Sequence, residues 1–253
     1  MSGDIGSLVS LCAQLPRPWL VGVDVDGTLA PIVPRPEMSR LAPHALEVLE
    51  ALIDCVGVSV AVVSGRPLAD LRHRFEFPGG AMLLGSHGAE VGTEVDRRTD
   101  VEQALMDDTE AELEAISACL PGSWIEHKPL AIALHVRQVD DALGEHTLTD
   151  LGDTYSTVAG ITMHRGHKVM ELSIRPSSKV LAFTNLRTRL EPATSFFIGD
   201  DSSDEHVFGS LGPRDMSIKV GPGPTGARHR LSDPDAVVAL LRGLSESVST
   251  GVR

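Results

Sequence analysis

Short apolar runs rich in β-branched residues alternate along this chain with stretches that have leucine and alanine at helical spacing. Residues 19–23 form the first apolar run, residues 43–54 a helical stretch with a proline near its start, and residues 56–63 the second run. A strand, a helix and a second strand make one right-handed crossover unit. The alternation therefore predicts an α/β fold with a largely parallel sheet.

The same alternation returns near the other end of the chain. We expect helices at residues 178–190, 204–211 and 234–244, with strands at 195–198 and 216–220. The glycine- and proline-rich residues 221–226 are expected to be a surface loop, as part of a longer loop that runs from 220 to 231.

Residues 98–174 have a pattern of their own. A helix is expected at 101–120, one or two strands within 125–136, a helix at 139–151, and short strands around Ile161 and Val169. This αββαββ order predicts an inserted α/β domain at 98–174, with residues 1–97 and 175–253 forming one core.

Charge and cysteine spacing exclude several classes of protein. The formal net charge is -13, from 35 acidic and 22 basic residues, which leaves no electrostatic footprint for nucleic acid. Cys12, Cys55 and Cys119 are isolated, without the spacing of a zinc site or a disulfide framework. With no apolar run near the roughly 18 residues of a membrane span and no signal-peptide pattern, we expect a cytoplasmic protein without a membrane partner.

Polar side chains follow the predicted core strands, at the edge where open parallel sheets bind ligands. Asp24 and Asp26 come directly after the first strand, in the segment Asp24-Val-Asp-Gly-Thr28. Two carboxylates at the end of a buried strand are unfavourable unless a cation or a proton compensates them. The segment therefore indicates a site rather than an ordinary acidic turn.

Three further segments have the same placement. Ser64-Gly65-Arg66 follows the second strand, and its hydroxyl and backbone N–H groups could bind a phosphoryl oxygen. Lys179 opens a predicted helix. The segment Gly199-Asp-Asp-Ser-Ser-Asp-Glu205 has four acids in six residues, and such hard oxygen ligands suit Mg²⁺. The helix dipole is sufficient to explain Glu205.

In this order, the four segments resemble the motifs of the haloacid dehalogenase superfamily of phosphotransferases. The resemblance implies a Rossmann-like parallel-sheet core, Mg²⁺ and covalent catalysis. Asp24 would attack phosphorus, and Asp26 would protonate the leaving oxygen and later deprotonate water. Mg²⁺ would be held by Asp24, Asp200 and the backbone carbonyl of Asp26, with Asp204 in contact with it through water or another ligand. Ser64, Gly65 and Lys179 would bind the phosphate.

More local matches resemble the branch that contains trehalose-6-phosphate phosphatases, in which residues 98–174 would be a type-2 cap that closes as a lid and selects the substrate. They are Gly85-Ser-His-Gly88, Glu126-His-Lys128, Leu134-His-Val-Arg137 and the segment 168–176. A disaccharide phosphate needs charged and amide partners for its many hydroxyls. The residues expected to contact the substrate are Arg66, His87, Glu126, Lys128 and Glu171.

Other histidines and arginines near these motifs are expected to have ordinary roles. His135 and Arg137 alternate with apolar neighbours and are expected to be structural, and His164 and His167 to be surface residues.

Three other functions stay open on the sequence. The substrate could be another glycosyl or pseudo-disaccharide phosphate, the chain could be an inactive regulatory or binding homologue, or it could transfer phosphate between hexoses. The presence of Asp24, Asp26, Lys179 and Asp200 together argues against an inactive homologue. The resemblance also implies a functional link to a trehalose-phosphate synthase.

Overall fold

The structure is a computed structural model that describes residues 5–33, 35–92, 98–166, 168–175 and 178–250. Its contacts divide the chain into two compact units. One, which we call the core unit, comprises Met1–Glu94 and Ser178–Arg253, and the other, the insert unit, comprises Val95–Ser177. The boundary expected at residues 97 and 98 borders the segment 93–97, which lies outside the described residues.

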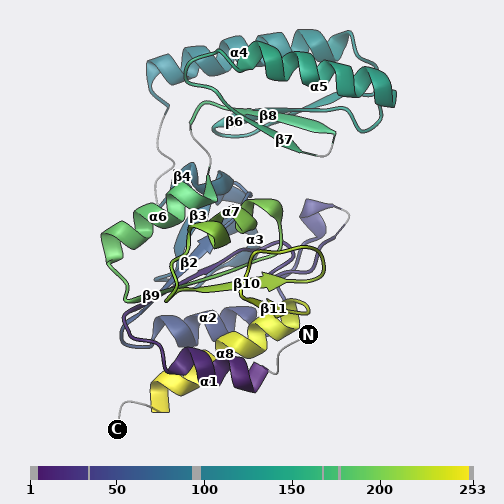
Figure 1. Ribbon diagram of the computed structural model, residues 1–253. Helices are drawn as coiled ribbons and strands as arrows, with labels where there is room; N and C mark the ends of the chain where they lie inside the picture. The colour runs from purple at the N-terminus through teal and green to yellow at the C-terminus, as the bar shows by residue number, and fades with distance from the viewer. Residues whose placement is uncertain (1–4, 34, 93–97, 167, 176–177, 251–253) are drawn as a thin grey trace. The chain divides into compact units, whose positions relative to one another are not determined.

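A seven-stranded sheet in the order β11-β10-β9-β1-β2-β3-β4 forms the centre of the core unit (Figure 1). Every pairing in it is parallel except that of β3 with β4. This confirms the α/β fold with a largely parallel sheet. The strands are β1 (Trp19–Val23), β2 (Val58–Val63), β3 (Met82–Gly85), β4 (Glu90–Val91), β9 (Thr194–Gly199), β10 (Met216–Val220) and β11 (His229–Leu231).

Helices cover both faces of this sheet, so alternate residues of β1 enter two different apolar clusters. Val21 and Val23 pack with residues of α1, α2, α3 and α8, whereas Leu20 packs with residues of α6 and α7. Within the described residues, no helix is long and apolar enough to cross a membrane. The helices are α1 (Ile5–Ala13), α2 (Ala45–Ile53), α3 (Leu68–Phe75), α6 (Lys179–Leu190), α7 (Ser202–Ser210) and α8 (Pro234–Thr250), with short 3-10 turns at Pro36–Met38 and Ser86–Gly88.

Several core elements were not expected from the sequence. They are α1, α3, β3, β4 and β11, and α8 continues to Thr250 instead of ending near residue 244. Strand β11 lies within the segment expected to be loop, because its three residues become a strand only by pairing with β10. Helix α3 has Arg72, His73 and Arg74 in its last turn, so the apolar period is weak there.

The insert unit is an antiparallel sheet in the order β5-β6-β8-β7 with two helices on one face (Figure 1). Its element order is the αββαββ order expected from the sequence. Helix α4 begins with a capping box in which the Thr99 hydroxyl and the Glu102 carboxylate satisfy each other's backbone N–H. The elements are α4 (Asp100–Ala118), β5 (Trp124–His127), β6 (Ala131–His135), α5 (Asp141–Tyr155), β7 (Thr162–Gly166) and β8 (Val169–Ser173).

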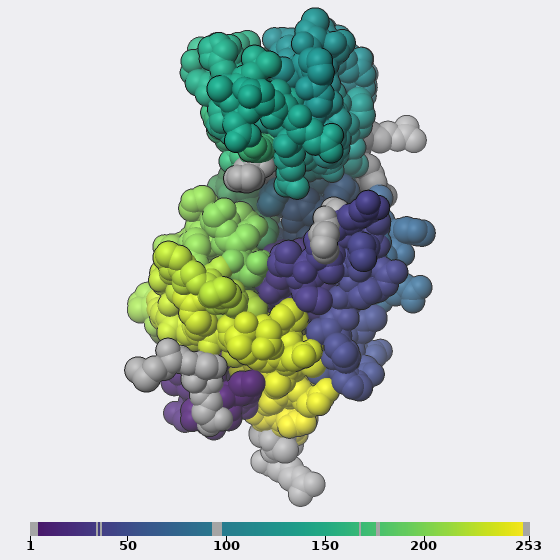
Figure 2. Space-filling model, turned by 90° about the vertical axis from the view of Figure 1, so that its right-hand side faces the viewer, coloured from purple at the N-terminus to yellow at the C-terminus, as the bar shows by residue number. Residues whose placement is uncertain are grey.

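The first and last helices, α1 and α8, pack against each other on the core unit (Figures 1 and 2). The two helices approach closely at Gly243, where an added Cβ would lie 2.5 Å from Cγ2 of Val9. Glycine in a helix interior costs about 0.5–1 kcal/mol relative to alanine. Its presence in α8 is therefore explained by the close approach of α1.

Replacing this glycine tests the packing of the two helices. Gly243→Ala should lower the free energy of unfolding by about 1–3 kcal/mol, because the valine side chain is stiff and cannot move aside. Chemical denaturation measures the change. Gly209→Ala in α7 is the matched control, because an added Cβ there meets nothing within 4 Å. An equal or stabilising effect of both substitutions would show that α1 does not pack on α8 in this way.

Candidate active site

The register of the core sheet brings the ends of three strands to one level. Strand β1 ends opposite Val62 of β2 and Ile198 of β9. The chain continues from these strands into Asp24, Ser64 and Asp200. Three segments that are far apart in the sequence therefore emerge at the same edge of the sheet.

The buried ammonium group of Lys179 lies among three carboxylates at this edge. Nζ of Lys179 is 3.2 Å from Asp24 Oδ1, 2.8 Å from Asp204 Oδ1 and 3.8 Å from Asp201 Oδ1. Lys179 is 3% exposed and is the first residue of α6, where the Ser178 side chain caps the helix by accepting from the Leu181 N–H. We call Lys179 and these carboxylates, together with Asp200, the lysine cluster.

The lysine cluster has more carboxylates than cations, and its pKa values reflect this. Burial raises the pKa of Asp24 to about 7 against the attraction of Lys179, and the charges of Asp201 and Asp200 add to the rise. Burial and the charges of Asp204 and Asp201 likewise raise the pKa of Asp200 to about 6. Burial alone would lower the pKa of Lys179, but Asp24, Asp204 and Asp201 raise it above its ordinary value.

Asp204 is fully buried and has no oxygen left without a partner. Its Oδ1 accepts from Lys179, and its Oδ2 accepts from the backbone N–H groups of Asp200 and Asp201 at 2.9 and 3.1 Å. Asp201 in turn caps α7 by accepting from the Asp204 N–H at 2.9 Å. These bonds make Asp204 the anchor of the loop that carries Asp200.

The carboxylates of Asp24, Asp200 and Asp204 lie close enough together to hold a cation. One carboxylate oxygen from each lies within 4.8 Å of the others. Oδ1 of Asp200 is buried and has no hydrogen-bond partner among the described residues, although a buried charged oxygen normally has one. An all-oxygen donor set suits Mg²⁺. The residues present therefore fit the metal that the sequence predicts.

Gly27 is required by this arrangement. Its φ is +84°, and an added Cβ would lie 2.0 Å from Oδ2 of Asp200. Only glycine has both the backbone freedom and the lack of side chain that let the carboxylate approach so closely.

Asp26 faces a different partner from Asp24, although only one residue separates them. The guanidinium of Arg66 donates to both of its carboxylate oxygens, from Nε at 2.5 Å and from Nη2 at 2.8 Å. The buried Ser39 hydroxyl donates to Oδ1 at 3.0 Å. Nη1 of Arg66 donates to Asp70 at 2.6 Å. The role expected for Arg66 as a substrate ligand stays a prediction, and in this structure two carboxylates hold its guanidinium.

The Ser64 loop is closed by backbone bonds on both sides. Ser64 is 1% exposed. Its hydroxyl accepts a hydrogen bond from the Arg66 N–H at 3.2 Å, and its backbone carbonyl accepts one from the His87 N–H at 2.9 Å. A hydroxyl that accepts one bond can still donate its own proton. A Cβ on Gly65 would lie 2.8 Å from the His87 ring, so these two residues, both expected from the sequence, are neighbours.

The polar residues predicted for the insert unit share the sheet face that the helices leave uncovered. Glu126 lies opposite Ala133, which lies opposite Glu171. Lys128, the first residue after β5, pairs with Glu171, and its Nζ is 4.0 Å from Glu126 Oε2. We call Glu126, Lys128 and Glu171 the insert triad.

Two aromatic side chains border the insert triad. His135 shares a hydrogen bond of 2.9 Å with Glu126 and stacks on Trp124 with ring centroids 3.6 Å apart. The hydrogen bond with His135 and the charge of Lys128 lower the pKa of Glu126. His164, an exposed residue as expected, lies opposite Glu171 in the same row, whereas His167 is outside the described residues.

Some residues at the site were not expected from the sequence. Lys219 is buried in the apolar strand β10 and donates to the backbone carbonyl of Asp200. A charged residue inside an apolar strand is a signal that could have revealed it. Ser39, Asp70 and Trp124 have no such signal, because their partners come from remote parts of the chain.

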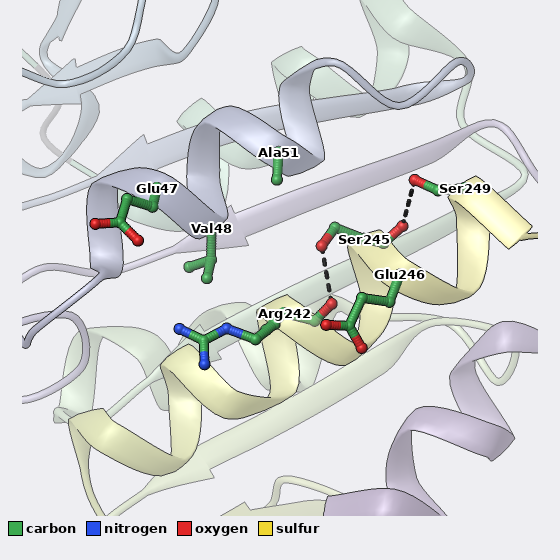
Figure 3. Close-up of a pocket in the computed structure, with 7 residues that line it drawn as sticks. All are labelled: Glu47, Val48, Ala51, Arg242, Ser245, Glu246 and Ser249. Carbon is green, nitrogen blue, oxygen red and sulfur yellow. Dashed lines mark hydrogen bonds between the residues drawn. The ribbon is translucent and has the colours of Figure 1, made fainter.

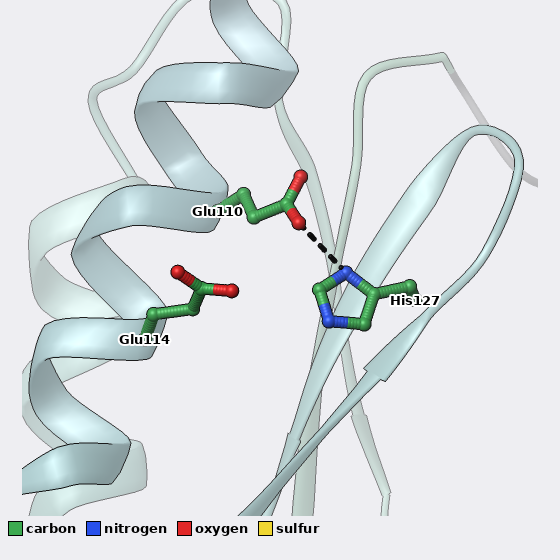
Figure 4. A group of neighbouring side chains, drawn as sticks. All are labelled: Glu110, Glu114 and His127. Carbon is green, nitrogen blue, oxygen red and sulfur yellow. Dashed lines mark ion pairs between the residues drawn. The ribbon is translucent and has the colours of Figure 1, made fainter.

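Two other features lie apart from these residues. An open groove of about 460 Å³ between α2 and α8 contains none of the residues predicted to act in chemistry (Figure 3). In the insert unit, His127 faces α4 and pairs with Glu110 at 3.0 Å, beside Glu114 (Figure 4). The imidazole is 53% exposed and the Glu110 side chain 37%, so this is a solvated ion pair, unlike the lysine cluster.

Comparison with known proteins identifies the family. The family model described as trehalose-phosphatase matches residues 22–235. The chain belongs to the trehalose-phosphatase family. It is 31% identical over 220 residues to the trehalose-6-phosphate phosphatase of Escherichia coli (strain K12), covering 83% of this chain and 80% of that one.

A further relative resembles the chain in sequence, and a solved structure resembles it in fold. The chain is 32% identical over 232 residues to the bifunctional trehalose-6-phosphate synthase/phosphatase of Thermoproteus tenax, covering 89% of this chain but only 32% of that protein's length. The structure of Aspergillus fumigatus trehalose-6-phosphate phosphatase superposes with a TM-score of 0.72 at 24% identity and covers 97% of this chain and 98% of that chain.

The raised pKa values predict how stability depends on pH in the metal-free protein. Because the pKa of Asp24 rises from 3.8 to about 7 on folding, the stability that its protonation contributes is present at low pH and lost as pH rises through about 7. Asp24→Asn, which cannot ionise, should flatten this part of the curve. The measurement is the free energy of unfolding against pH with a chelator present. An identical pH dependence in both proteins would contradict the buried, charge-crowded setting of Asp24.

Proposed function

We propose that this protein hydrolyses trehalose 6-phosphate to trehalose and phosphate through an aspartyl-phosphate on Asp24. The observation that carries the proposal is the lysine cluster at the carboxyl edge of the parallel sheet, which joins a nucleophilic carboxylate, a phosphate-neutralising ammonium and a partnerless carboxylate oxygen. The family to which the chain belongs is the second support.

In the first step Asp24 would attack phosphorus in line, and the bond from phosphorus to the sugar oxygen would break. Lys179, 3.2 Å from Asp24, would orient the nucleophile and lower the charge that the phosphate meets. The Ser64 hydroxyl and the Gly65 N–H would bind phosphoryl oxygens. Asp26 would give its proton to the departing sugar oxygen.

In the second step Asp26 would take a proton from water as the water oxygen attacks the aspartyl-phosphate. This breaks the bond to Asp24 and releases inorganic phosphate, so both aspartates return to their starting states. When bound, Mg²⁺ supplies positive charge that reduces the repulsion between the carboxylate and the phosphate dianion. Asp24, Asp200 and the Asp26 carbonyl would hold it, while Asp204 positions the loop.

The insert unit is proposed to be the cap that recognises the sugar. The insert triad presents two carboxylates and an ammonium on one uncovered sheet face, and such groups can bond several hydroxyls at once. His87 is proposed to contact the substrate from the core unit.

A functional link with a trehalose-phosphate synthase is also proposed, because the Thermoproteus tenax relative is described as joining synthase and phosphatase in one protein. A cytoplasmic location is also proposed, because the substrate of a phosphatase of this kind is a phosphorylated metabolite.

The proposed reaction predicts a substrate preference and a metal requirement. Phosphate release from trehalose 6-phosphate should exceed release from glucose 6-phosphate and sucrose 6-phosphate, should require Mg²⁺, and should fall to background in Asp24→Asn. A coupled phosphate assay on the panel measures this, with thermal melting to verify that the variant folds. Preference for another sugar phosphate would keep the chemistry and change the substrate. Absence of release from every substrate would favour a regulatory protein.

The second prediction concerns the insert triad. Glu126→Ala should raise the KM for trehalose 6-phosphate by roughly 10- to 100-fold, the worth of one or two hydrogen bonds to a charged group, and leave the KM for 4-nitrophenyl phosphate little changed. Glu114→Ala, an exposed glutamate of the same unit, is the control and should affect neither. An equal loss on both substrates would remove Glu126 from sugar recognition.

A further inference from the structure

Arg66 is held by three side chains of the core unit, those of Asp26, Asp70 and Phe75. Its side chain is 9% exposed, its guanidinium carbon lies 5.5 Å from the centroid of the Phe75 ring, and its three nitrogens donate to Asp26 and Asp70. Arg74 donates to the other carboxylate oxygen of Asp70, Oδ1, from Nε at 3.2 Å and from Nη2 at 3.1 Å. These bonds therefore fix the orientation of the guanidinium within the core unit.

The bond geometry between Arg66 and Asp26 is the bidentate one. Two parallel N–H groups meet the two carboxylate oxygens, and the buried Ser39 hydroxyl adds a third bond. Such a pair fixes the plane of the carboxylate as well as its charge. A guanidinium that is bonded to carboxylates in this way is poorly suited to bind a sugar or a phosphate, because a new ligand would first have to displace a carboxylate.

We propose that Arg66 is a positioning residue, which acts through Asp26 and not on the substrate. The inference rests on the proposed function, in which Asp26 donates a proton to the leaving oxygen as the bond from phosphorus to that oxygen breaks. Donation leaves Asp26 as a carboxylate, the species that the two N–H groups of Arg66 and the Ser39 hydroxyl stabilise. Water then returns the proton to Asp26 during attack on the aspartyl-phosphate. Asp70 keeps the guanidinium in place through both steps.

The test is the dependence of kcat/KM on the leaving group in a series of aryl phosphates that contain no sugar. kcat/KM reports the steps up to departure of the leaving group, and protonation matters little for 4-nitrophenolate but strongly for phenolate. Arg66→Lys keeps the charge but cannot form the bidentate pair. It should lower kcat/KM by about tenfold or more for phenyl phosphate and by at most about threefold for 4-nitrophenyl phosphate.

Two variants separate positioning from a structural role. In an Asp26→Asn background, Arg66→Lys should cause no further loss, because the group through which it acts is gone. Asp70→Asn should steepen the same leaving-group dependence to a smaller degree, and it also serves if Arg66→Lys does not fold. Arg72→Gln, on the same helix, is the control and should leave the dependence unchanged.

The alternatives give different patterns. Equal losses across the aryl series would assign Arg66 to the phosphate, and a loss confined to trehalose 6-phosphate would assign it to the sugar; either result overturns the proposal. If the wild-type protein hydrolyses aryl phosphates but the variants keep its leaving-group dependence, only this inference fails. If the wild-type protein releases phosphate neither from the aryl phosphates nor from trehalose 6-phosphate, the proposed function fails with it.

Discussion

The candidate active site depends on one buried ion-pair network, that of Lys179 with Asp24, Asp201 and Asp204. Without this cation, burial and mutual repulsion would favour protonation of the carboxylates. Even beside Lys179, burial raises the pKa of Asp24. Removing the ammonium would leave the buried carboxylates of Asp24 and Asp204 without their cation, and breaking a buried ion pair in this way is strongly destabilising. The chain's own residues thus hold the carboxylates of the site together.

Two carboxylates that are neighbours in the sequence are given different surroundings by the fold. Asp24 meets the ammonium of Lys179, and Asp26 meets the guanidinium of Arg66. Different surroundings are what allow two chemically identical groups to take different parts in one reaction. In this chain the division is between the proposed nucleophile and the proposed proton donor, and each has its own buried cation.

The acidic residues that follow β9 also differ from one another in their hydrogen-bond partners. Asp201 caps α7, and Asp204 bonds the backbone of the loop and Lys179. Asp200 Oδ1, like Glu205 Oε1, is a buried oxygen that has no hydrogen-bond partner among the described residues. Lys219 secures the carbonyl of Asp200 from the neighbouring strand. The four acids of this segment therefore do not form one set of equivalent ligands, and the bonds that distinguish them come from elements on three sides of the loop.

The sequence by itself determined the α/β core, the strand ends that carry Asp24, Ser64 and Asp200, and the αββαββ order of the insert unit, because alternation and strand-end motifs are local patterns. The short elements α3 and β11 could not be predicted, since a polar last turn and a three-residue strand carry almost no periodic signal. Only the tertiary structure decided the partners: Arg66 lies 40 residues from Asp26 in sequence, and Lys128 lies 43 from Glu171. The spacing of residues along the chain determines which of them share a helix or strand. The partner of a buried charged group depends instead on which opposite charge the packing of different elements places beside it.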